Sequence, residues 1–535
     1  MNKIGFQNFR RFQNFPAIEC SGITFLVGRN NAGKSTLVKA IILIDNYLKS
    51  NNYRRFSFGN NILEDANIVT FGRAKTINSG IDTIEFTYQI DNYLIDIILS
   101  GEDDKSYANV LKLIICDVNN GIKFLFDFTG NILHLIKETG SSALKINLQP
   151  LIDLDDEIDD IEVLLMGSNL KKTSKEYIEY ISRLDALKQK KDNLINNNNL
   201  ESNSKEAFNL HSDFGRNISL VDIVLDSIND ITNRYENEFK SIQEGNEPSA
   251  DFEDLRAFKE FDPIIAESIY THFDILIKDF SVAYLGASST KQSALFAIRD
   301  KNNALAQTIH EYVQYGIKKG EEEYLFVIKW MKEFEIGSDF EINIHAGEAY
   351  EVIINSNNNS IQLADKGMGS IQAMLLILRL ACVIKRLKID MDRVSGYKKY
   401  DGNGLNPSAD FRLLLDNTTV IMEEPELNLH PALQSKITDL LYFTHQNFKI
   451  NFIIETHSEY ILRRSQVLVI ENDLALTELS LNPFKSYYFS NSYSLPYSLN
   501  YNPDGTFDKN FGKGFFDEAS GITLELIKLK RQKNQ

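Results

Sequence analysis

The chain has 535 residues and carries 57 Lys and Arg against 74 Asp and Glu, a formal net charge of -17 at pH 7. This length suffices for more than one domain, and the acidic balance excludes a surface coated for nucleic-acid binding, although a local basic groove stays open. Three widely spaced cysteines, Cys20, Cys116 and Cys382, exclude a disulfide framework and a structural zinc site. No leader-like segment precedes the first expected strand, and the longest apolar run (373–384) is too short to cross a bilayer, so we expect a cytoplasmic protein without a membrane partner.

The N-terminal residues Lys3–Phe15 alternate apolar and polar side chains and predict one opening strand. Arg10 and Arg11 lie near its end. They fit equally well a solvated strand end and a contact with a phosphate or an adenine, because the strand precedes a glycine-rich loop.

That loop, Gly28–Thr36, reads G-x-x-x-x-G-K-S-T between the apolar strand Ile23–Val27 and an apolar helix. Its glycines let backbone N–H groups converge on phosphate oxygens at a helix N-terminus. Lys34 is expected to reach the β- and γ-phosphates, and the Ser35 hydroxyl to hold Mg²⁺. The stretch predicts a nucleoside triphosphate site with these contacts: Gly28, Asn30, Asn31, Ala32, Gly33, Lys34, Ser35 and Thr36.

Five short segments rich in β-branched and aromatic residues follow and predict an antiparallel meander, which completes a lobe over residues 1–150. The predicted strands are Thr83–Ile90, Tyr93–Ser100, Val110–Cys116, Ile122–Phe128 and Ile132–Ile136.

Helical patterns then predict an inserted helical domain with a short hairpin over residues 151–335. Its acidic run at 153–160 fits a solvated helix entrance better than a metal site, because no other ligand type converges with it. Helices are expected over 178–194, 220–239, 262–280 and 304–334. A C-terminal lobe over 336–480 and a tail over 481–535 complete the expected organisation.

The C-terminal lobe opens with predicted strands at Phe340–His345 and Tyr350–Ile354. A glycine-bearing turn then leads into a helix over Ala373–Leu387. Gly367, Gly369 and Ser370 mark a second helix start that could bind an anion. These residues fit either a contact with the nucleotide of a partner subunit or an ordinary capped helix start.

Two further apolar strands end in polar groups. Val420–Glu426 ends in consecutive carboxylates, and a parallel strand would place them at the sheet edge where the phosphate loop also lies. There Glu423 is expected to hold Mg²⁺ and Glu424 to orient and deprotonate the attacking water. The stretch Asn451–Ser458 predicts a second apolar strand ending in His457, which is expected to contact a γ-phosphate and to report its hydrolysis. The plainer alternatives are a solvated acidic loop and a structural histidine.

The strings GRNNAGKST, LADKGMGSIQ, VIMEEPELNLHP and IIETHS together resemble the ABC-type ATPases of the SMC/RecF/OLD group. The combination E-E-P-E-x-x-L-H-P with E-T-H-S-E-Y resembles bacterial AAA-family ATPases, including the PtuA and OLD-like antiphage-defence proteins. The resemblance departs at two points: the signature lacks a Ser-Gly-Gly-Gln string, and Glu423 stands where Asp is usual.

This resemblance implies an α/β fold, an ABC-type P-loop ATPase head with a mixed sheet flanked by helices, an antiparallel meander and an inserted helical domain. It also implies ATP and Mg²⁺ as cofactors, Lys34, Glu424 and His457 as catalytic residues, and a homodimer or higher homo-oligomer that encloses ATP.

Two functions follow from it: an ATP-hydrolysing regulator of an effector nuclease in antiphage defence, or a RecF/SMC-like DNA-repair clamp without an effector. The transporter alternative fits less well, given the signature and the long insert. A basic loop is expected over Lys385–Asp410 and could contact DNA, RNA or a partner, although such loops are more often solvated.

Overall fold

The computed structural model describes residues 3–50, 52–59, 68–77, 79–90, 93–119, 121–130, 132–139, 204–211, 233–244, 281–286, 293, 295–300, 303–356, 359–397, 418–475, 482–490, 495–512, 522 and 525. The chain divides into two compact units. The first comprises Met1–Asp91, Ile97–Val110 and Thr271–Gln535, and the second comprises Asn92–Asp96 and Leu111–Tyr270.

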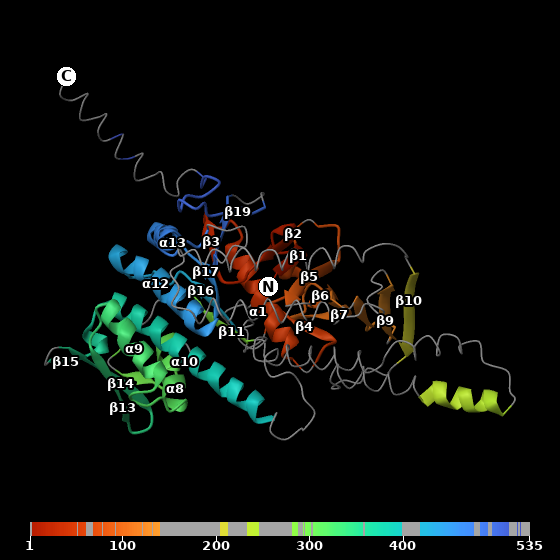
Figure 1. Cartoon of the computed structure of the whole chain (residues 1–535), viewed down its shortest axis with the longest axis horizontal. Coiled ribbons are helices and arrows are strands. Elements are labelled where there is room, and N and C mark those ends of the chain that lie inside the picture. Colours follow the sequence, from red (N-terminus) through yellow and green to blue (C-terminus); the bar gives the residue numbers. More distant parts are fainter. Residues whose placement is uncertain are drawn as a thin grey trace, which may run out of the picture. The chain divides into compact units, whose positions relative to one another are not determined.

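A six-stranded sheet forms the centre of the first unit (Figure 1). Five strands are parallel, and only β19 runs antiparallel, to β18. The middle strands are almost continuously apolar, as a parallel sheet covered on both faces requires. In spatial order the strands are β11 (Ser281–Leu285), β16 (Thr418–Glu423), β17 (Asn451–Glu455), β3 (Ile23–Gly28), β18 (Phe484–Phe489) and β19 (Tyr497–Leu499).

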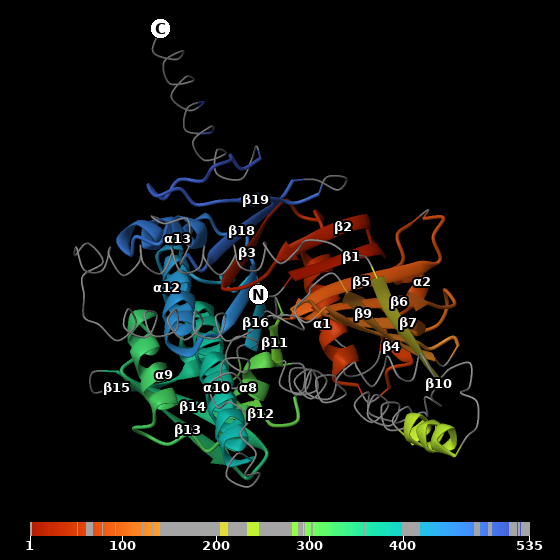
Figure 2. The ribbon, with the colours of Figure 1, turned by 45° about the vertical axis from the view of Figure 1, so that its right-hand side comes forward.

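Helices cover both faces of this sheet. Helix α1 (Lys34–Leu48) contacts β3 and β11, whereas α12 (Pro431–Phe448) contacts β3 and β17 and packs on α13 (Glu459–Glu471). Figures 1 and 2 both show α1 on one side of the sheet and α12 on the other. The phosphate loop between β3 and α1 therefore lies at the carboxyl edge of the parallel strands.

A buried helix, α10 (Met368–Tyr397), forms the core of the rest of this lobe and packs against α8 (Ala304–Gln314) and α9 (Glu322–Glu333). Within the described part of the chain, its stretch Met368–Asp390 is long and apolar enough to cross a membrane. However, most of that stretch is already buried inside the protein, as in a core helix. A 3₁₀ turn, η1 (Leu363–Asp365), precedes it.

Two expectations about this lobe need correction. The single helix predicted over 304–334 is two helices, because Gly316 and Gly320 adopt left-handed φ values of 61° and 92° between them. Both helices lie in the first unit. The basic segment expected as a loop from residue 385 continues α10 as far as Tyr397.

A small antiparallel sheet lies beside these helices. It consists of β12 (Phe296–Ala297), β14 (Ala349–Ser356) and β13 (Asp339–His345), with β15 (Asn359–Gln362) paired to β14. The predicted strands at 340–345 and 350–354 correspond to β13 and β14.

The opening segment is a hairpin rather than the single predicted strand. Strand β1 (Lys3–Phe9) pairs antiparallel with β2 (Phe12–Glu19) and with β5 (Thr83–Ile90). The chain reverses because Asn8 and Arg10 both have a φ of 54°. Strand β4 (Arg55–Ser57) and the short helix α2 (Phe71–Ala74) also belong to this unit.

The second unit is built on an antiparallel meander. Strand β7 (Tyr107–Asp117) pairs with β8 (Ile122–Asp127), β8 with β9 (Ile132–Thr139), and β9 with β10 (Ser204–His211). Strand β6 (Tyr93–Ser100) and β7 are divided between the two units. The predicted meander is confirmed, whereas the helices predicted over 178–194 and 262–280 lie outside the described residues.

Asn8 fixes the hairpin that carries Arg10 and Arg11. Its side chain is 1% exposed, and its amide donates to the carbonyls of Ile81 (2.8 Å) and Thr83 (2.6 Å) while its oxygen accepts the N–H of Thr76 (3.3 Å).

We expect Asn8→Gly to lower the free energy of unfolding by about 2 kcal/mol, because buried backbone groups lose their partners. Asn8→Ala should cost about 1 kcal/mol more, since only glycine adopts this φ without strain. Urea unfolding of the two variants measures both effects. Wild-type stability in Asn8→Ala would contradict this assignment.

Candidate functional site

Both glycines of the G-x-x-x-x-G-K-S-T string occupy positions where a side chain cannot fit. Gly28 has a φ of 133°, and a Cβ there would lie 2.1 Å from the carbonyl oxygen of Phe489. Gly33 has a φ of 105°, and a Cβ there would lie 2.5 Å from the ring of Phe12. The loop is thus held in one conformation between β18 and the N-terminal hairpin. Gly33 also begins α1 without any side-chain cap.

The Lys34 ammonium is folded back into this loop. It is 3% exposed and donates to the carbonyl oxygens of Gly28 (3.2 Å) and Arg29 (3.0 Å). Burial lowers the pKa of Lys34, and the carboxylate of Glu455 offsets this only in part. A buried cation whose donors rest on loop carbonyls is well placed to exchange them for phosphate oxygens.

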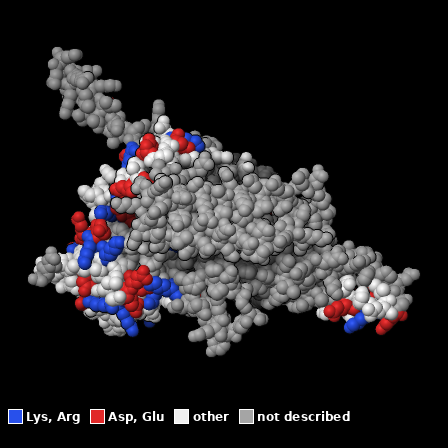
Figure 3. Space-filling model, viewed as in Figure 1, with Lys and Arg blue, Asp and Glu red and all other residues white. Residues whose placement is uncertain are grey.

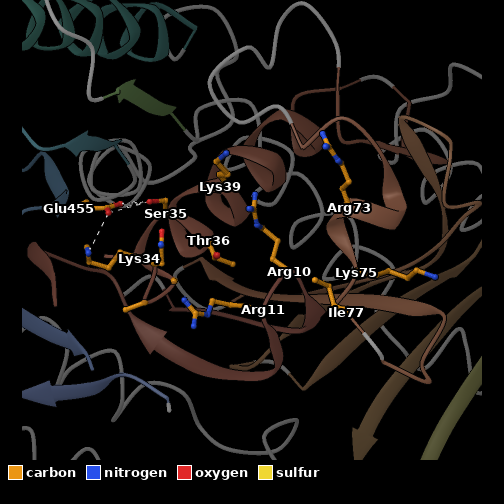
Figure 4. Close-up of a pocket in the computed structure, with 13 residues that line it drawn as sticks. Arg10, Arg11, Lys34, Ser35, Thr36, Lys39, Arg73, Lys75, Ile77 and Glu455 are labelled. Carbon is orange, nitrogen blue, oxygen red and sulfur yellow. Dashed lines mark hydrogen bonds and ion pairs between the residues drawn. The ribbon is translucent and has the colours of Figure 1, made fainter. Parts of the chain in front are cut away.

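Glu455 is the site residue that sequence reasoning missed. It ends β17, beside the phosphate-loop strand, and accepts the Ser35 hydroxyl at 2.9 and 3.2 Å. Its Oε1 lies 3.7 Å from the Lys34 Nζ (Figure 4). Burial is the main cause that raises the pKa of Glu455 to about 7; Lys34 opposes it, and Glu423 adds to it. The available signal was its place at the end of the strand before His457.

The predicted acids and histidine meet at the same sheet edge. Glu423 and Glu455 are paired in the parallel register of β16 and β17. Glu424 follows with a φ of 47°, and its N–H donates to the carbonyl of Glu455 at 2.7 Å. The His457 Nε2 lies 3.9 Å from Glu424 Oε1. Burial, and then Lys34, lower the pKa of His457, so the imidazole is neutral at pH 7.

The donor set at this edge fits Mg²⁺. Ser35, Glu423 and Glu455 supply a hydroxyl and two carboxylates, the hard oxygen ligands that this ion takes. Within the described ranges, no three acidic, histidine or cysteine side chains converge enough to hold a metal by themselves. Magnesium sites of nucleotide enzymes are normally completed by phosphate oxygens, so the protein side of the site is sufficient.

A pocket of about 440 Å³ opens beside the loop, and its lining includes several Lys and Arg residues. Figure 4 shows their side chains around α1 and the N-terminal hairpin. Of the two readings of Arg10 and Arg11, the pocket position favours a ligand contact. Lys39, Arg73, Lys75 and Ile77 also line it and were not predicted, although Lys75 is paired with Asp103 at 2.8 Å. The remaining lining residues are Asn31, Ala32, Gly33, Lys34, Ser35, Thr36 and Glu455.

The predicted signature residues do not line this pocket. A Cβ added to Gly367 would have no neighbouring atom within 4 Å. Ser370 lies in the first turn of α10. A Cβ on Gly369 would lie 2.9 Å from the carbonyl oxygen of Asn428, so this glycine permits close packing against the turn after β16 in the same chain. Their contact with a nucleotide of a second subunit stays a prediction.

The first basic residues of the 385–410 segment are used within the protein. Lys385 pairs with Glu321 at 2.8 Å, and Lys388 pairs with Glu322 at 2.6 Å. On the face seen in Figure 3, the described Lys and Arg side chains lie intermixed with Asp and Glu. These lysines therefore give little support to a nucleic-acid contact.

Comparison with solved structures finds SMC head domains, all at low identity. One is an Smc head with an extended coiled coil bound to the C-terminal domain of ScpA, from Pyrococcus furiosus, with 10% identity over 98% of this chain and 100% of that chain and a TM-score of 0.34. The SMC head domain of Thermotoga maritima has 10% identity over 93% of this chain and 98% of that chain, with a TM-score of 0.31. The Smc head domain with a coiled coil and joint from Pyrococcus yayanosii has 12% identity over 94% of this chain and 98% of that chain, with a TM-score of 0.33. At these TM-scores the likeness carries no conclusion about partners or activity.

A family model supplies the stronger comparison. No curated protein matches the sequence. The model of the AAA ATPase domain family (AAA_15) matches residues 1–462, which include the phosphate loop, both acidic strand ends and His457. Because this match spans well over half of the sequence, the chain belongs to the AAA ATPase domain family.

Proposed function

We propose that the chain binds Mg²⁺-ATP at the edge of the parallel sheet and hydrolyses it to ADP and phosphate. The observation that carries the proposal is the meeting of three neighbouring strand ends. They bring together the phosphate loop after β3, Glu455 at the end of β17, and Glu423 and Glu424 at the end of β16.

Each side chain has a role that its position supports. The loop amides and Lys34 bind the phosphates, while Ser35, Glu423 and Glu455 would hold Mg²⁺, which neutralises charge on the phosphate oxygens. Glu424 orients the attacking water and accepts its proton. The neutral His457 imidazole, 3.9 Å from Glu424, can form a hydrogen bond to the γ-phosphate or to the water.

We further propose that two or more copies of the chain assemble around ATP. Gly367, Gly369 and Ser370 lie at the N-terminus of the 30-residue helix α10, yet they are absent from the lining of the pocket of their own chain. A helix N-terminus favours an anion, so the phosphates of a second subunit's ATP are suitable occupants.

The assembly would act on a partner effector, a nuclease, in cytoplasmic antiphage defence. This part of the proposal rests on the sequence strings E-E-P-E-x-x-L-H-P and E-T-H-S-E-Y. Purification of the tagged chain from its native host, followed by mass spectrometry and a nuclease assay with and without ATP, tests it. Isolation with DNA and no second protein would favour the clamp function instead.

The first prediction concerns Glu424. Glu424→Gln should reduce the hydrolysis rate by a factor of about 100 or more, because the amide cannot accept the proton of water. The dissociation constant for ATP should change little, since Lys34 and the loop are intact. Steady-state phosphate release and equilibrium ATP binding measure the two quantities. Hydrolysis at the wild-type rate would show that Glu424 is not the general base.

The second concerns Glu455 in the nucleotide-free protein. Its pKa is raised from 4.5 to about 7, so between these pH values the unfolded chain loses a proton that the folded chain keeps. The free energy of unfolding therefore falls as pH rises through this window. Above about pH 7 the folded protein bears the full destabilisation caused by the buried, ionised Glu455 carboxylate. Glu455→Gln removes this ionisable group. The variant should therefore be more stable than the wild type by on the order of 2 kcal/mol at about pH 8, and nearly equal in stability at about pH 4.5.

Unfolding at both pH values measures this difference. Glu348→Gln, at an exposed glutamate, is the control for the change in formal charge. An equal effect of Glu455→Gln at both pH values would contradict the raised pKa.

The third concerns assembly. In the Glu424→Gln background, ATP should shift the protein to a dimer or larger species, and Ser370→Arg should prevent this without weakening ATP binding by the monomer. Sedimentation velocity with and without ATP measures it. Leu325→Arg, at a residue that is 55% exposed on α9, is the control. Ser370→Arg is preferred to a change at Gly369, which would disturb the Asn428 contact. Unchanged assembly in Ser370→Arg would remove this surface from the proposal.

A further inference from the structure

A buried carboxylate joins the acidic turn after β16 to the histidine segment after β17. Glu426 is 8% exposed, and its Oε1 accepts two hydrogen bonds. One comes from the Thr456 hydroxyl and the other from the backbone N–H of His457, both at 2.8 Å. Its Oε2 is also buried and has no hydrogen-bond partner in the described structure. Among the described residues, the Glu426 side chain therefore accepts hydrogen bonds from Thr456 and His457, in the segment 456–458 that we call the histidine segment.

The histidine segment is tied to the same region at its other end. The Ser458 N–H donates to the Thr456 hydroxyl at 3.0 Å, and the Ser458 hydroxyl donates to Gln434 Oε1 at 2.6 Å. The Gln434 amide in turn donates to the carbonyl of Leu429 at 3.0 Å. Residues 456–458 are therefore held between the turn and the first turns of α12.

The turn itself is rigid and closely packed on its opposite side. Glu424 and Asn428 have left-handed φ values of 47° and 61°, and the N–H of Leu429 donates to the carbonyl of Glu426 at 3.0 Å. The Asn428 carbonyl lies against Gly369 at the start of α10, where a Cβ would come within 2.9 Å. The turn therefore lies between the start of α10 and the histidine segment.

We propose that Glu426 is a positioning residue for hydrolysis, which fixes His457 relative to Glu424 and couples its position to the turn 424–429. Because Oε1 binds the backbone N–H of His457, the turn that carries Glu424 also holds the segment that carries the imidazole. The inference rests on the proposed ATP hydrolysis, in which Glu424 and His457 act together. Glu426 itself acts only through the groups that it holds.

Two substitutions of similar size at Glu426 test the role of the Oε1 acceptor, because one keeps a hydrogen-bond acceptor at this position and the other removes it. Glu426→Gln keeps a carbonyl acceptor for both N–H and hydroxyl donors, so it should retain the wild-type kcat within about twofold. Glu426→Met has no such acceptor and should reduce kcat by a factor of about 10 or more. KM and the dissociation constant for ATP should stay within about twofold in both, because the phosphate loop is untouched. Thr456→Val, which removes one of the two bonds, should show a smaller loss.

A double-mutant cycle separates positioning from general support of the fold. If Glu426 acts through His457, Glu426→Met should cause no further loss of kcat in the His457→Ala background. A full multiplicative loss in that background, or a wild-type kcat in Glu426→Met, would overturn the inference. If Glu426→Met does not fold, Thr456→Val in the same cycle gives the same two outcomes.

A measurement without turnover keeps this inference separate from the proposed function. In protein with isotopically labelled histidine, the ring resonances of His457, assigned by their loss in His457→Ala, should shift in Glu426→Met and not in Glu426→Gln. Absence of hydrolysis in the wild type would refute the proposed function, whereas unchanged His457 resonances in Glu426→Met would refute the positioning role.

Discussion

The site depends on one hydrogen bond, from the Ser35 hydroxyl at the start of α1 to the Glu455 carboxylate at the end of β17. It joins the phosphate loop to the two strands that carry the acids, since β16 pairs with β17 in a register that sets Glu423 beside Glu455. The bond exists because the carboxyl ends of parallel strands meet at one edge. Burial keeps it in a low-dielectric setting, where the Lys34 Nζ lies 3.7 Å from the Glu455 Oε1.

Strong local patterns made much of this predictable. The phosphate loop, its flanking strand and helix, and the meander were expected from motif and periodicity, and the loop's left-handed glycines show why those residues are required. Glu455 was missed because a glutamate at a strand end has no pattern of its own; only strand order places it beside Ser35. Arg73 and Lys75 were missed for the same reason, since α2 reaches the pocket through tertiary packing. The opening hairpin and the break between α8 and α9 each depend on two left-handed residues, which periodicity does not detect.

The acidic turn and the histidine segment are held together by tertiary contacts that cannot be deduced from the sequence motifs. Glu426, Asn428 and Gln434 connect the start of α10, the acidic turn and the histidine segment through packing and hydrogen bonds. Within one chain, the helix start predicted to face a second nucleotide is therefore also in contact with the turn that carries Glu424, the proposed general base. In the proposed assembly, the helix start that faces a second subunit and the residues proposed for hydrolysis would therefore share this turn.

The central claim is that three strand ends form one Mg²⁺-ATP site, and calorimetric titration of ATP with and without Mg²⁺ tests it most directly. The wild type should bind ATP more tightly with Mg²⁺, and the double variant Glu423→Gln/Glu455→Gln should lose that gain while still binding ATP through Lys34. Lys34→Ala should bind weakly in both conditions. A double variant that keeps the full gain from Mg²⁺ would contradict the assignment of these carboxylates.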